Sequence, residues 1–170
     1  NNAGILSTTD QQSIEQVDID QWRAVQSVNV EGVFLGCQTA VLAMKERGGS
    51  IINMSSVAGL IASPGIVAYG ASKGAVRQLT KSIAIDCARK GYKIRCNSVH
   101  PGYIETELGR GSMNLGGGDP AENYKKRIAL TPMGEPGAPS DIANAVLFLA
   151  SAEASHITGA ELVCLLYTSD

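Results

Sequence analysis

Residues 50–56, with the sequence Ser-Ile-Ile-Asn-Met-Ser-Ser, decide how this chain is expected to fold. The apolar run from Ser50 to Met54 contains two consecutive isoleucines and lies between Gly48-Gly49 and two serines. A short apolar run bounded by turn residues is typical of a strand that is buried on both faces. Strands of this kind belong to parallel sheets that are covered by helices on both sides.

Helical patterns flank this strand. A helix is expected to begin after Asp18 or Asp20, either of which can cap it, and to end at Gly48-Gly49. Helices that alternate with short apolar strands predict right-handed crossovers and a doubly wound, Rossmann-like parallel α/β sheet. The other expected elements are a helix over 69–90, a strand over 93–99 that Pro101-Gly102 breaks, a mobile Gly-rich loop over 109–118, helices over 121–130 and from 136 to 150, and a strand over 161–166.

Composition limits the possible partners. The chain has 170 residues, 44% of them hydrophobic and 18% charged, which suits one compact domain. The formal net charge is -2, and the longest basic run is the triplet at 125–127. Nucleic acid and anionic membranes are therefore not expected as partners. We find no leader-like pattern and expect no apolar stretch near the ~20 residues that span a bilayer, so a soluble protein is predicted. The cysteines, described next, favour the cytoplasm.

The histidines and cysteines do not indicate a metal site. His100 and His156 have no ligand-like spacing to each other or to a cysteine. No Cys-x-x-Cys pair occurs, and three of the four cysteines lie in apolar periodic segments, which favours buried thiols in a reducing compartment. The cysteines are Cys37, Cys87, Cys96 and Cys164.

Tyr69 and Lys73 form the most informative pair. A spacing of four places both side chains on one face of a helix, about one turn apart. A nearby ammonium favours the phenolate form of a tyrosine, whose unperturbed pKa is ~10. The pair therefore predicts a proton donor and acceptor that works near neutral pH.

Five motifs, taken in order and spacing, closely resemble those of the short-chain dehydrogenase/reductase family. The resemblance extends from Asn1 to about Val163. The five motifs are Asn1-Asn2-Ala3-Gly4, Val28-Asn29-Val30-Glu31-Gly32, Ser55-Ser56-Val57-Ala58-Gly59, Tyr69 with Lys73, and Asn97-Ser98-Val99-His100-Pro101-Gly102.

The resemblance implies four catalytic residues. The family serine lies 13 positions before the tyrosine, which selects Ser56 and leaves Ser55 as a structural neighbour. Tyr69 is then the general acid/base, and Ser56 stabilises the charge that develops on the substrate oxygen. Lys73 lowers the pKa of Tyr69 and holds the nicotinamide ribose, while Asn29 positions a water that passes protons to solvent.

The same resemblance implies NAD or NADP as cofactor. Small residues at the chain start let the backbone approach the ribose, and the segment after the second strand walls the nicotinamide and binds its carboxamide. The implied cofactor-binding residues are Asn2, Ala3, Gly4, Tyr69, Lys73, Pro101, Gly102, Ile104 and Thr106.

Two features depart from the family pattern. No Gly-x-x-x-Gly-x-Gly follows a strand in these residues, so the phosphate loop and the residue that selects NAD or NADP are missing. We therefore expect residues 1–163 to be a partial Rossmann-like domain that is truncated at its N-terminus. Residues 164–170, Cys-Leu-Leu-Tyr-Thr-Ser-Asp, resemble a translated sequencing adapter, so we expect Cys164 and Tyr167 to have no function.

The function expected of the parent enzyme is interconversion of a secondary alcohol and a ketone. Aliphatic residues around the site favour a lipophilic, cyclic or steroid-like substrate: Ile61, Ile66, Val67 and Leu108. One alternative is 3-oxoacyl-[acyl-carrier-protein] reduction, which a basic patch at the pocket mouth would favour, although no obvious patch is evident. The alternative of another class is a non-catalytic binding or regulatory protein of the same fold. The resemblance also suggests a homotetramer or homodimer built in part by the helix at 69–90.

Overall fold

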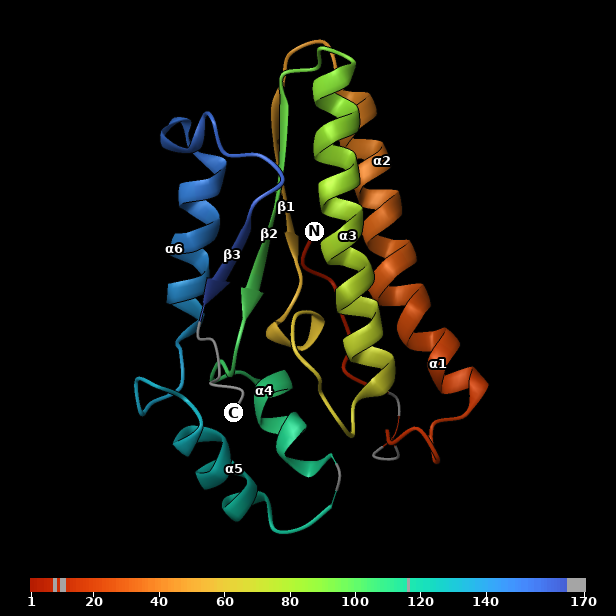
Figure 1. The fold of residues 1–170 in the computed structure, drawn as a ribbon, viewed down its shortest axis with the longest axis vertical. Helices are drawn as coiled ribbons and strands as arrows, with labels where there is room; N and C mark the ends of the chain where they lie inside the picture. Colours follow the sequence, from red (N-terminus) through yellow and green to blue (C-terminus); the bar gives the residue numbers. More distant parts are fainter. Residues whose placement is uncertain (8, 10–11, 116, 165–170) are drawn as a thin grey trace.

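A three-stranded parallel sheet forms the centre of the computed structural model, which describes residues 1–7, 9, 12–115 and 117–164. The strand order is β1-β2-β3. Helices α2 and α3 cover one face of the sheet and α6 covers the other (Figure 1). This arrangement confirms the predicted doubly wound α/β architecture. The strands are β1 (Gly49–Met54), β2 (Ile94–Pro101) and β3 (Glu161–Cys164).

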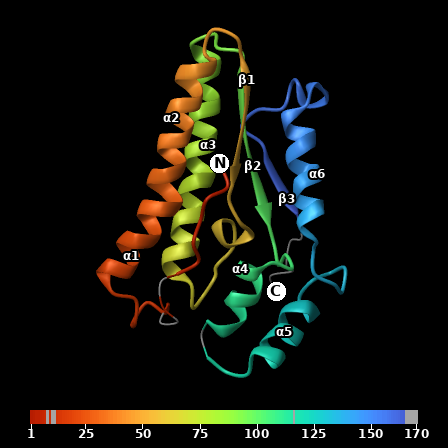
Figure 2. The same ribbon diagram turned by 180° about the vertical axis from the view of Figure 1, so that it is seen from behind.

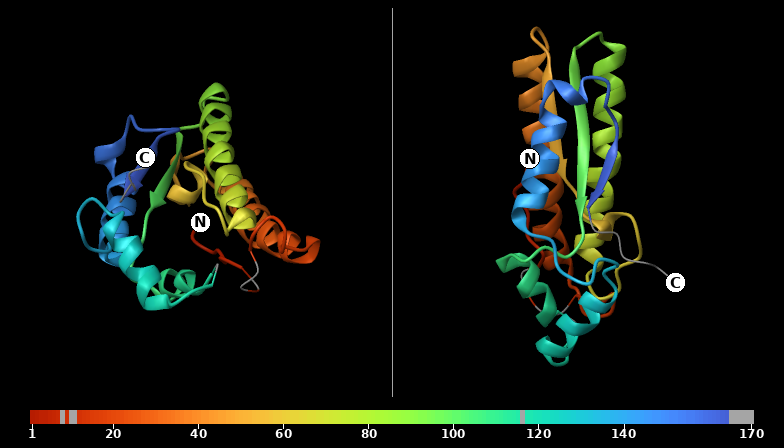
Figure 3. Two further views of the ribbon diagram at one scale, coloured as in Figure 1. Left: turned by 60° about the horizontal axis from the view of Figure 1, so that its bottom comes forward. Right: turned by 90° about the vertical axis from the view of Figure 1, so that its left-hand side faces the viewer.

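The register of the strands brings their carboxyl ends to one edge. Met54 of β1 pairs with Val99 of β2, and Pro101 of β2 pairs with Cys164 of β3. The arrows of β1 and β2 point toward α4 and α5, which lie beyond this edge (Figures 1 and 3). In open parallel sheets, ligands bind outside the carboxyl ends of the strands.

The first helical segment is continuous but contains a π-helical turn. Asp18 caps α1 (Ile19–Gln26) by accepting a hydrogen bond from Gln21 N at 2.8 Å. The segment then passes through the π turn Ser27–Glu31 into α2 (Gly32–Met44). Figure 2 shows this helix lying along α3.

This segment corrects one expectation from the sequence. Over Ile19–Met44, its 26 residues make it long and apolar enough to cross a membrane by length and composition alone. The expectation that no stretch reaches such a length was therefore wrong. Such a helix is weak support for a membrane span, because core helices pass the same test. Here, Val33 and Cys37 belong to the hydrophobic core shared with α3, β1 and β2, although only 17% of the apolar window is buried in the structure.

The main hydrophobic core lies between the sheet and the helices α2 and α3. Helix α3 (Val67–Arg89) begins two residues before the predicted start. Three of the four cysteines are buried, as predicted. The fully buried members of this core are Val33, Cys37, Ile51, Val76, Ala84, Cys87, Ile94 and Cys96.

Part of the expected Gly-rich loop is helical and contributes to a core. It contains α4 (Glu107–Gly111) and the 3-10 turn Ser112–Asn114. Gly109 and Met113 are buried, and Met113 packs with Val57 and Tyr103 in a second, smaller core. One apolar side chain therefore anchors a segment whose glycines suggested mobility.

The C-terminal part matches the predicted elements with shifted boundaries. Helix α5 spans Pro120–Ala129 and α6 spans Pro139–Ala150. In α6, only Leu149 is buried, and Ala150 at the end of the helix is exposed. The remaining short turns are Val57–Gly59 and Ala152–Ala154.

Cys164, which was expected to begin the non-native tail, belongs to the last strand of the sheet. Cys164 is the last residue of β3, and its carbonyl accepts a hydrogen bond from Gly102 N at 2.7 Å. Residues 165–170, where the rest of the predicted strand and non-native tail would fall, lie outside the described residues.

Candidate active site

A cavity of 1320 Å³ lies at the carboxyl edge of the sheet. Its walls come from the chain start, the segment after β1, the first turns of α3, the end of β2, and helices α4 to α6. Eleven different residues were predicted to act in the site, and nine of them line this cavity; Ala3 and Asn29 do not. The nine are Asn2, Gly4, Ser56, Tyr69, Lys73, Pro101, Gly102, Ile104 and Thr106.

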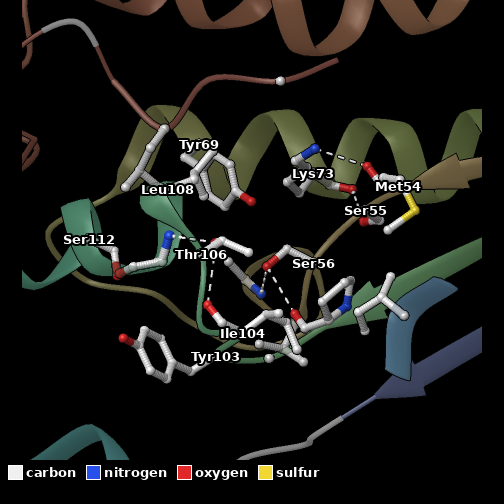
Figure 4. A pocket seen from close by; sticks show the side chains of 18 of the residues that line it. Met54, Ser55, Ser56, Tyr69, Lys73, Tyr103, Ile104, Thr106, Leu108 and Ser112 are labelled. Atoms are coloured by element: carbon white, nitrogen blue, oxygen red, sulfur yellow. Dashed lines mark hydrogen bonds between the residues drawn. The ribbon is translucent and has the colours of Figure 1, made fainter. Parts of the chain in front are cut away.

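Ser56, Tyr69 and Lys73 form what we call the floor of the cavity (Figure 4). Ser56 follows β1 and caps the turn Val57–Gly59: its Oγ accepts a hydrogen bond from Ala58 N at 3.2 Å. The same oxygen lies 3.4 Å from the Pro101 carbonyl, to which it donates. The serine is thus held between the β1 and β2 ends.

Lys73 is buried beneath Tyr69 on α3. Its Nζ lies 5.5 Å from the centre of the Tyr69 ring and donates to the Met54 carbonyl at 2.9 Å. Because the ammonium is largely removed from water, burial lowers the pKa of Lys73 to about 8. The lysine can therefore exchange a proton close to neutral pH.

The pKa of Tyr69 differs from the prediction. Burial raises the pKa of this phenol, and a hydrogen bond with Ser56 lowers it only in part. The expected net decrease caused by Lys73 is therefore absent in the chain by itself. Desolvation of the phenolate outweighs the benefit of its neighbours.

Asn29 is fully buried in the π turn Ser27–Glu31. Its Nδ2 donates to the Ile5 carbonyl at 2.8 Å and to Ser72 Oγ at 3.0 Å, and its Oδ1 accepts from Ile5 N at 2.8 Å. Asn29 thus ties the chain start to α3. Turns of this kind are frequent at functional sites.

Gly4 separates Asn29 from Lys73. A Cβ atom at Gly4 would lie 3.4 Å from both Asn29 Oδ1 and Lys73 Nζ. One lone pair of this Oδ1 is not used by the bond from Ile5. A side chain at this position would therefore contact both an amide oxygen and an ammonium, whereas glycine leaves the space between them open.

Thr106 begins α4 on the opposite side of the cavity. Its Oγ1 accepts a hydrogen bond from Gly109 N at 3.0 Å, which makes it the cap of this helix. The hydroxyl also lies 3.4 Å from the Ile104 carbonyl, to which it donates. The cap role and the predicted cofactor role therefore fall on the same atom, since a hydroxyl oxygen can accept a second bond.

Three neighbours of the floor were not assigned roles from the sequence. Ser55 Oγ donates to the Lys73 carbonyl at 2.8 Å. A Cβ at Gly59 would lie 2.6 Å from the Lys73 carbonyl carbon, so the turn after β1 presses against α3. His100 Nδ1 lies 3.2 Å from the Ser56 carbonyl. Each lies within one of the five motifs quoted from the sequence, and Ser55 was expected there as a structural neighbour.

The outer wall of the cavity is a second set of residues, contributed by α4, the turn after it, and α5. The rings of Tyr103 and Tyr124 meet edge to face at 5.8 Å. Asn123 Nδ2 donates to the carbonyls of Met113 and Gly117, both at 2.9 Å. The outer wall consists of Leu108, Met113, Leu115, Asn123, Lys126, Arg127 and Leu130.

Two cations in this wall correct the sequence analysis. Lys126 and Arg127 line the cavity on the same face of α5 as Asn123 and Leu130. The sequence had shown no obvious basic group at the pocket mouth, because the direction in which α5 faces is set by tertiary packing.

The cavity fits the nicotinamide end of a dinucleotide better than it fits a metal ion. Among the described residues, no group of three His, Cys, Asp or Glu side chains could hold a metal. The space beside Gly4, which a Cβ would begin to fill, suits a close approach of a ribose to the backbone. Lys73 and Thr106 provide polar atoms on opposite sides of the cavity.

Comparison with known proteins gives a consistent result. Residues 1–164 match the family model described as "Enoyl-(Acyl carrier protein) reductase". The chain is 47% identical over 165 residues to the NADP-dependent (R)-specific alcohol dehydrogenase of Lentilactobacillus kefiri, covering 96% of this chain and 62% of that protein. It is 40% identical over 164 residues to the cyclopentanol dehydrogenase of Comamonas sp. (strain NCIMB 9872), with shares of 96% and 62%.

A solved structure shows the same fold. The NAD+-bound xylitol dehydrogenase superposes with a TM-score of 0.90 at 30% identity, covering 96% of this chain and 65% of that one. The chain thus spans less than two thirds of the length of each of these proteins.

Proposed function

The chain belongs to the short-chain dehydrogenase/reductase family, and from this we propose that the whole protein interconverts a secondary alcohol and a ketone with NAD or NADP. The observation that carries the proposal is the floor of the cavity, where a serine, a tyrosine and a lysine meet. Relatives that are 40–47% identical include several dehydrogenases of alcohols.

In the proposed reaction, Tyr69 moves the proton at the substrate oxygen. The phenol gives its proton to a ketone oxygen during reduction and takes it back from the alcohol during oxidation. The Ser56 hydroxyl donates to the same oxygen and stabilises its developing charge. The bound nicotinamide supplies or accepts the hydride, so the protein needs no nucleophile.

Lys73 prepares Tyr69 for this exchange. With a pKa of about 8, the ammonium can lose a proton and regain one within the range in which enzymes work. We propose that Lys73 and Asn29 pass protons toward solvent through the space beside Gly4, and that Lys73 also holds the ribose. The remaining residues proposed for the cofactor are Asn2, Ala3, Gly4, Pro101, Gly102, Ile104 and Thr106.

The substrate is proposed to be lipophilic. The described side chains that face the cavity are mostly aliphatic, including Ile61, Ile66 and Leu108. Apolar walls with a few convergent polar groups are typical of sites for small apolar ligands. The relative from Comamonas, named for a cyclic alcohol, supports a ring-shaped substrate.

The test is oxidation of secondary alcohols by the whole protein with NAD+ and NADP+ in turn, followed by absorbance of the reduced nicotinamide. Tyr69→Phe is expected to reduce kcat roughly 10²- to 10⁴-fold, while Tyr92→Phe, in the turn after α3, is the matched control. Turnover that survives Tyr69→Phe rejects the acid/base role. Cofactor binding without turnover on any alcohol would favour the non-catalytic alternative.

A second candidate is reduction of a 3-oxoacyl group carried on an acyl carrier protein. Lys126 and Arg127 in the outer wall favour it, because they could meet an anionic carrier or substrate tail. Lys126→Ala should raise KM for a carrier-bound substrate and leave KM for neutral alcohols unchanged. Lys125→Ala is the control, since Lys125 pairs with Glu122 and does not line the cavity.

We also propose that copies of the whole protein associate through the outer face of α2 and α3. Large apolar side chains are exposed there, and such patches mark interaction sites. Light scattering should report a dimer or tetramer, and Leu35→Glu should shift it toward the monomer. The exposed side chains are Val28, Phe34, Leu35, Leu42 and Ile85.

A further inference from the structure

His100 lies behind the floor of the cavity rather than in its lining. It is in β2 and is fully buried, with 0% of its surface exposed. Its Nε2 is 2.8 Å from Ser98 Oγ, and its Nδ1 is 3.2 Å from the Ser56 carbonyl oxygen. The ring thus connects the middle of the sheet to the main chain of a proposed catalytic residue.

The chemistry of the two partners fixes the tautomer of His100. A carbonyl oxygen can only accept, so the proton of the neutral ring must be on Nδ1 and must point to Ser56. The bare Nε2 then accepts the hydroxyl proton of Ser98 at 2.8 Å, in preference to the Ala160 carbonyl, which lies 3.4 Å from the same hydroxyl. Burial lowers the pKa of His100, although the hydrogen bond to the Ser56 carbonyl and the charge of Glu161 act against it. The net decrease favours the neutral ring. Arg77 and Lys81, both paired with Glu161, act in the same direction as burial.

The hydrogen bond from His100 connects Ser56 to a side chain of the sheet, whereas some other contacts of Ser56 lie within its own turn. The Ser56 carbonyl also accepts from Gly59 N at 3.0 Å, but Gly59 belongs to the same turn and moves with it. The Ser56 hydroxyl contacts Ala58 N at 3.2 Å within the same turn, the Pro101 carbonyl at 3.4 Å, and Tyr69. His100 therefore ties the turn to the sheet by a side chain whose own position is fixed by burial and by Ser98.

We propose that His100 is a positioning residue for Ser56, held in place by Ser98 through a buried chain of two hydrogen bonds. This inference rests on the proposed function, because it assumes that Ser56 binds the reacting oxygen. Loss of the His100 donor would free the peptide between Ser56 and Val57 to rotate and would displace the serine hydroxyl. Small displacements of this kind are costly in enzymes, up to ~100-fold for about 1 Å.

The experiment is a double-mutant cycle between His100 and Ser56 in the whole protein, with a secondary alcohol as substrate. His100→Leu is expected to lower kcat about tenfold while KM for the cofactor stays constant. In a Ser56→Ala background, the same substitution should have no further effect, because its only route to the chemistry has been removed. Equal losses in both backgrounds would overturn the inference.

Conservative variants guard against misfolding. His100→Asn keeps an N–H near the position of Nδ1 and should recover most of the loss, whereas Ser98→Ala should show a smaller decrease than His100→Leu. His156→Leu removes an exposed histidine and is the matched control. Failure of His100→Asn to recover activity, in a protein with native thermal stability, contradicts the positioning role.

A second measurement separates this inference from the proposed function. Nitrogen-15 NMR of the histidine rings should show His100 protonated at Nδ1 and bare at Nε2 between pH 6 and 8. A ring that is protonated at Nε2 and bare at Nδ1 would contradict the positioning role even in an active enzyme. A protein in which wild type and Ser56→Ala turn over equally would instead overturn the proposed function, whatever the tautomer.

Discussion

The floor and the outer wall of the cavity are built from opposite kinds of contact. In the floor, Lys73 is 4% exposed and Ser56 9%, and their polar atoms bind main-chain groups of other elements. In the outer wall, Leu108 is 44% exposed and Leu130 53%, although Met113 is buried. A buried polar floor costs stability and fixes geometry, whereas an exposed apolar wall can change shape at little cost. Chemistry and substrate choice are therefore expected to respond to different substitutions.

The largest effect should follow from Lys73→Met, which removes the charge from the floor but keeps its volume. We expect kcat to fall by roughly 10²- to 10⁴-fold because Tyr69 loses its proton partner. Steady-state kinetics on the whole protein measure this. Lys90→Met, at the exposed end of α3, is the control. A decrease of less than about threefold would show that the floor does not set the chemistry.

The same variant should be more stable than wild type near pH 7. The pKa of Lys73 is lowered to about 8 in the folded protein from an ordinary 10.5. Below pH 8 both states are protonated, and the folded state bears the full cost of the buried charge. Between pH 8 and 10.5 only the unfolded state keeps the proton, so stability attributable to this group rises with pH.

Urea denaturation tests this prediction. At pH 7, the free energy of unfolding of Lys73→Met should exceed that of wild type by about 1–3 kcal/mol. This difference should shrink as the pH rises from 8 toward 10.5. A difference in stability that grows over this pH range would mean that burial of the Lys73 ammonium does not destabilise the folded protein.

A smaller effect is expected in the outer wall. Leu108→Ala should lower kcat/KM for a bulky lipophilic alcohol about tenfold relative to 2-propanol, since a few apolar contacts are lost. Its thermal stability should hardly change because the side chain is half exposed. Ile19→Ala, exposed at the start of α1, is the control. Equal losses for small and bulky alcohols would assign Leu108 to the chemistry instead.

The smallest effect should come from Asn123→Ala. This substitution removes the two hydrogen bonds that hold α5 to the segment of Met113 and Gly117, each worth about 1 kcal/mol. We expect KM for the alcohol to rise a few fold with kcat unchanged. Asn144→Ala, exposed on α6, provides the comparison. A decrease in kcat instead of a rise in KM would mean that this part of the outer wall contributes to the chemical step.

The sequence could predict that the motifs lie close together, because several of them follow strands that run in the same direction. Ser56 and the segment around Gly102 follow two strands, and the carboxyl ends of parallel strands meet at one edge. A spacing of four then placed Tyr69 and Lys73 on one helix face. These arguments need only local periodicity and chain order, which a sequence contains.

The features that were missed depend on packing between distant segments. The pKa of Tyr69 rises because the phenol is buried, and that burial is produced by the fold as a whole. Met113 can hold its segment in place only because it packs against Val57 and Tyr103, which come from other parts of the chain. The π turn at Asn29 adds one residue to a helical turn, and no periodicity reveals it.

Gly59 shows how the floor constrains residues that never meet a substrate. Even the smallest side chain there would lie 2.6 Å from the main chain of Lys73 and 2.8 Å from Gly74 N. Both contacts are with backbone, so no rotamer can relieve them. In a complete survey of single substitutions, this position should be as intolerant as Tyr69, although it carries no chemistry. Such a survey would therefore map the contact between a turn and a helix as sharply as it maps the reaction itself.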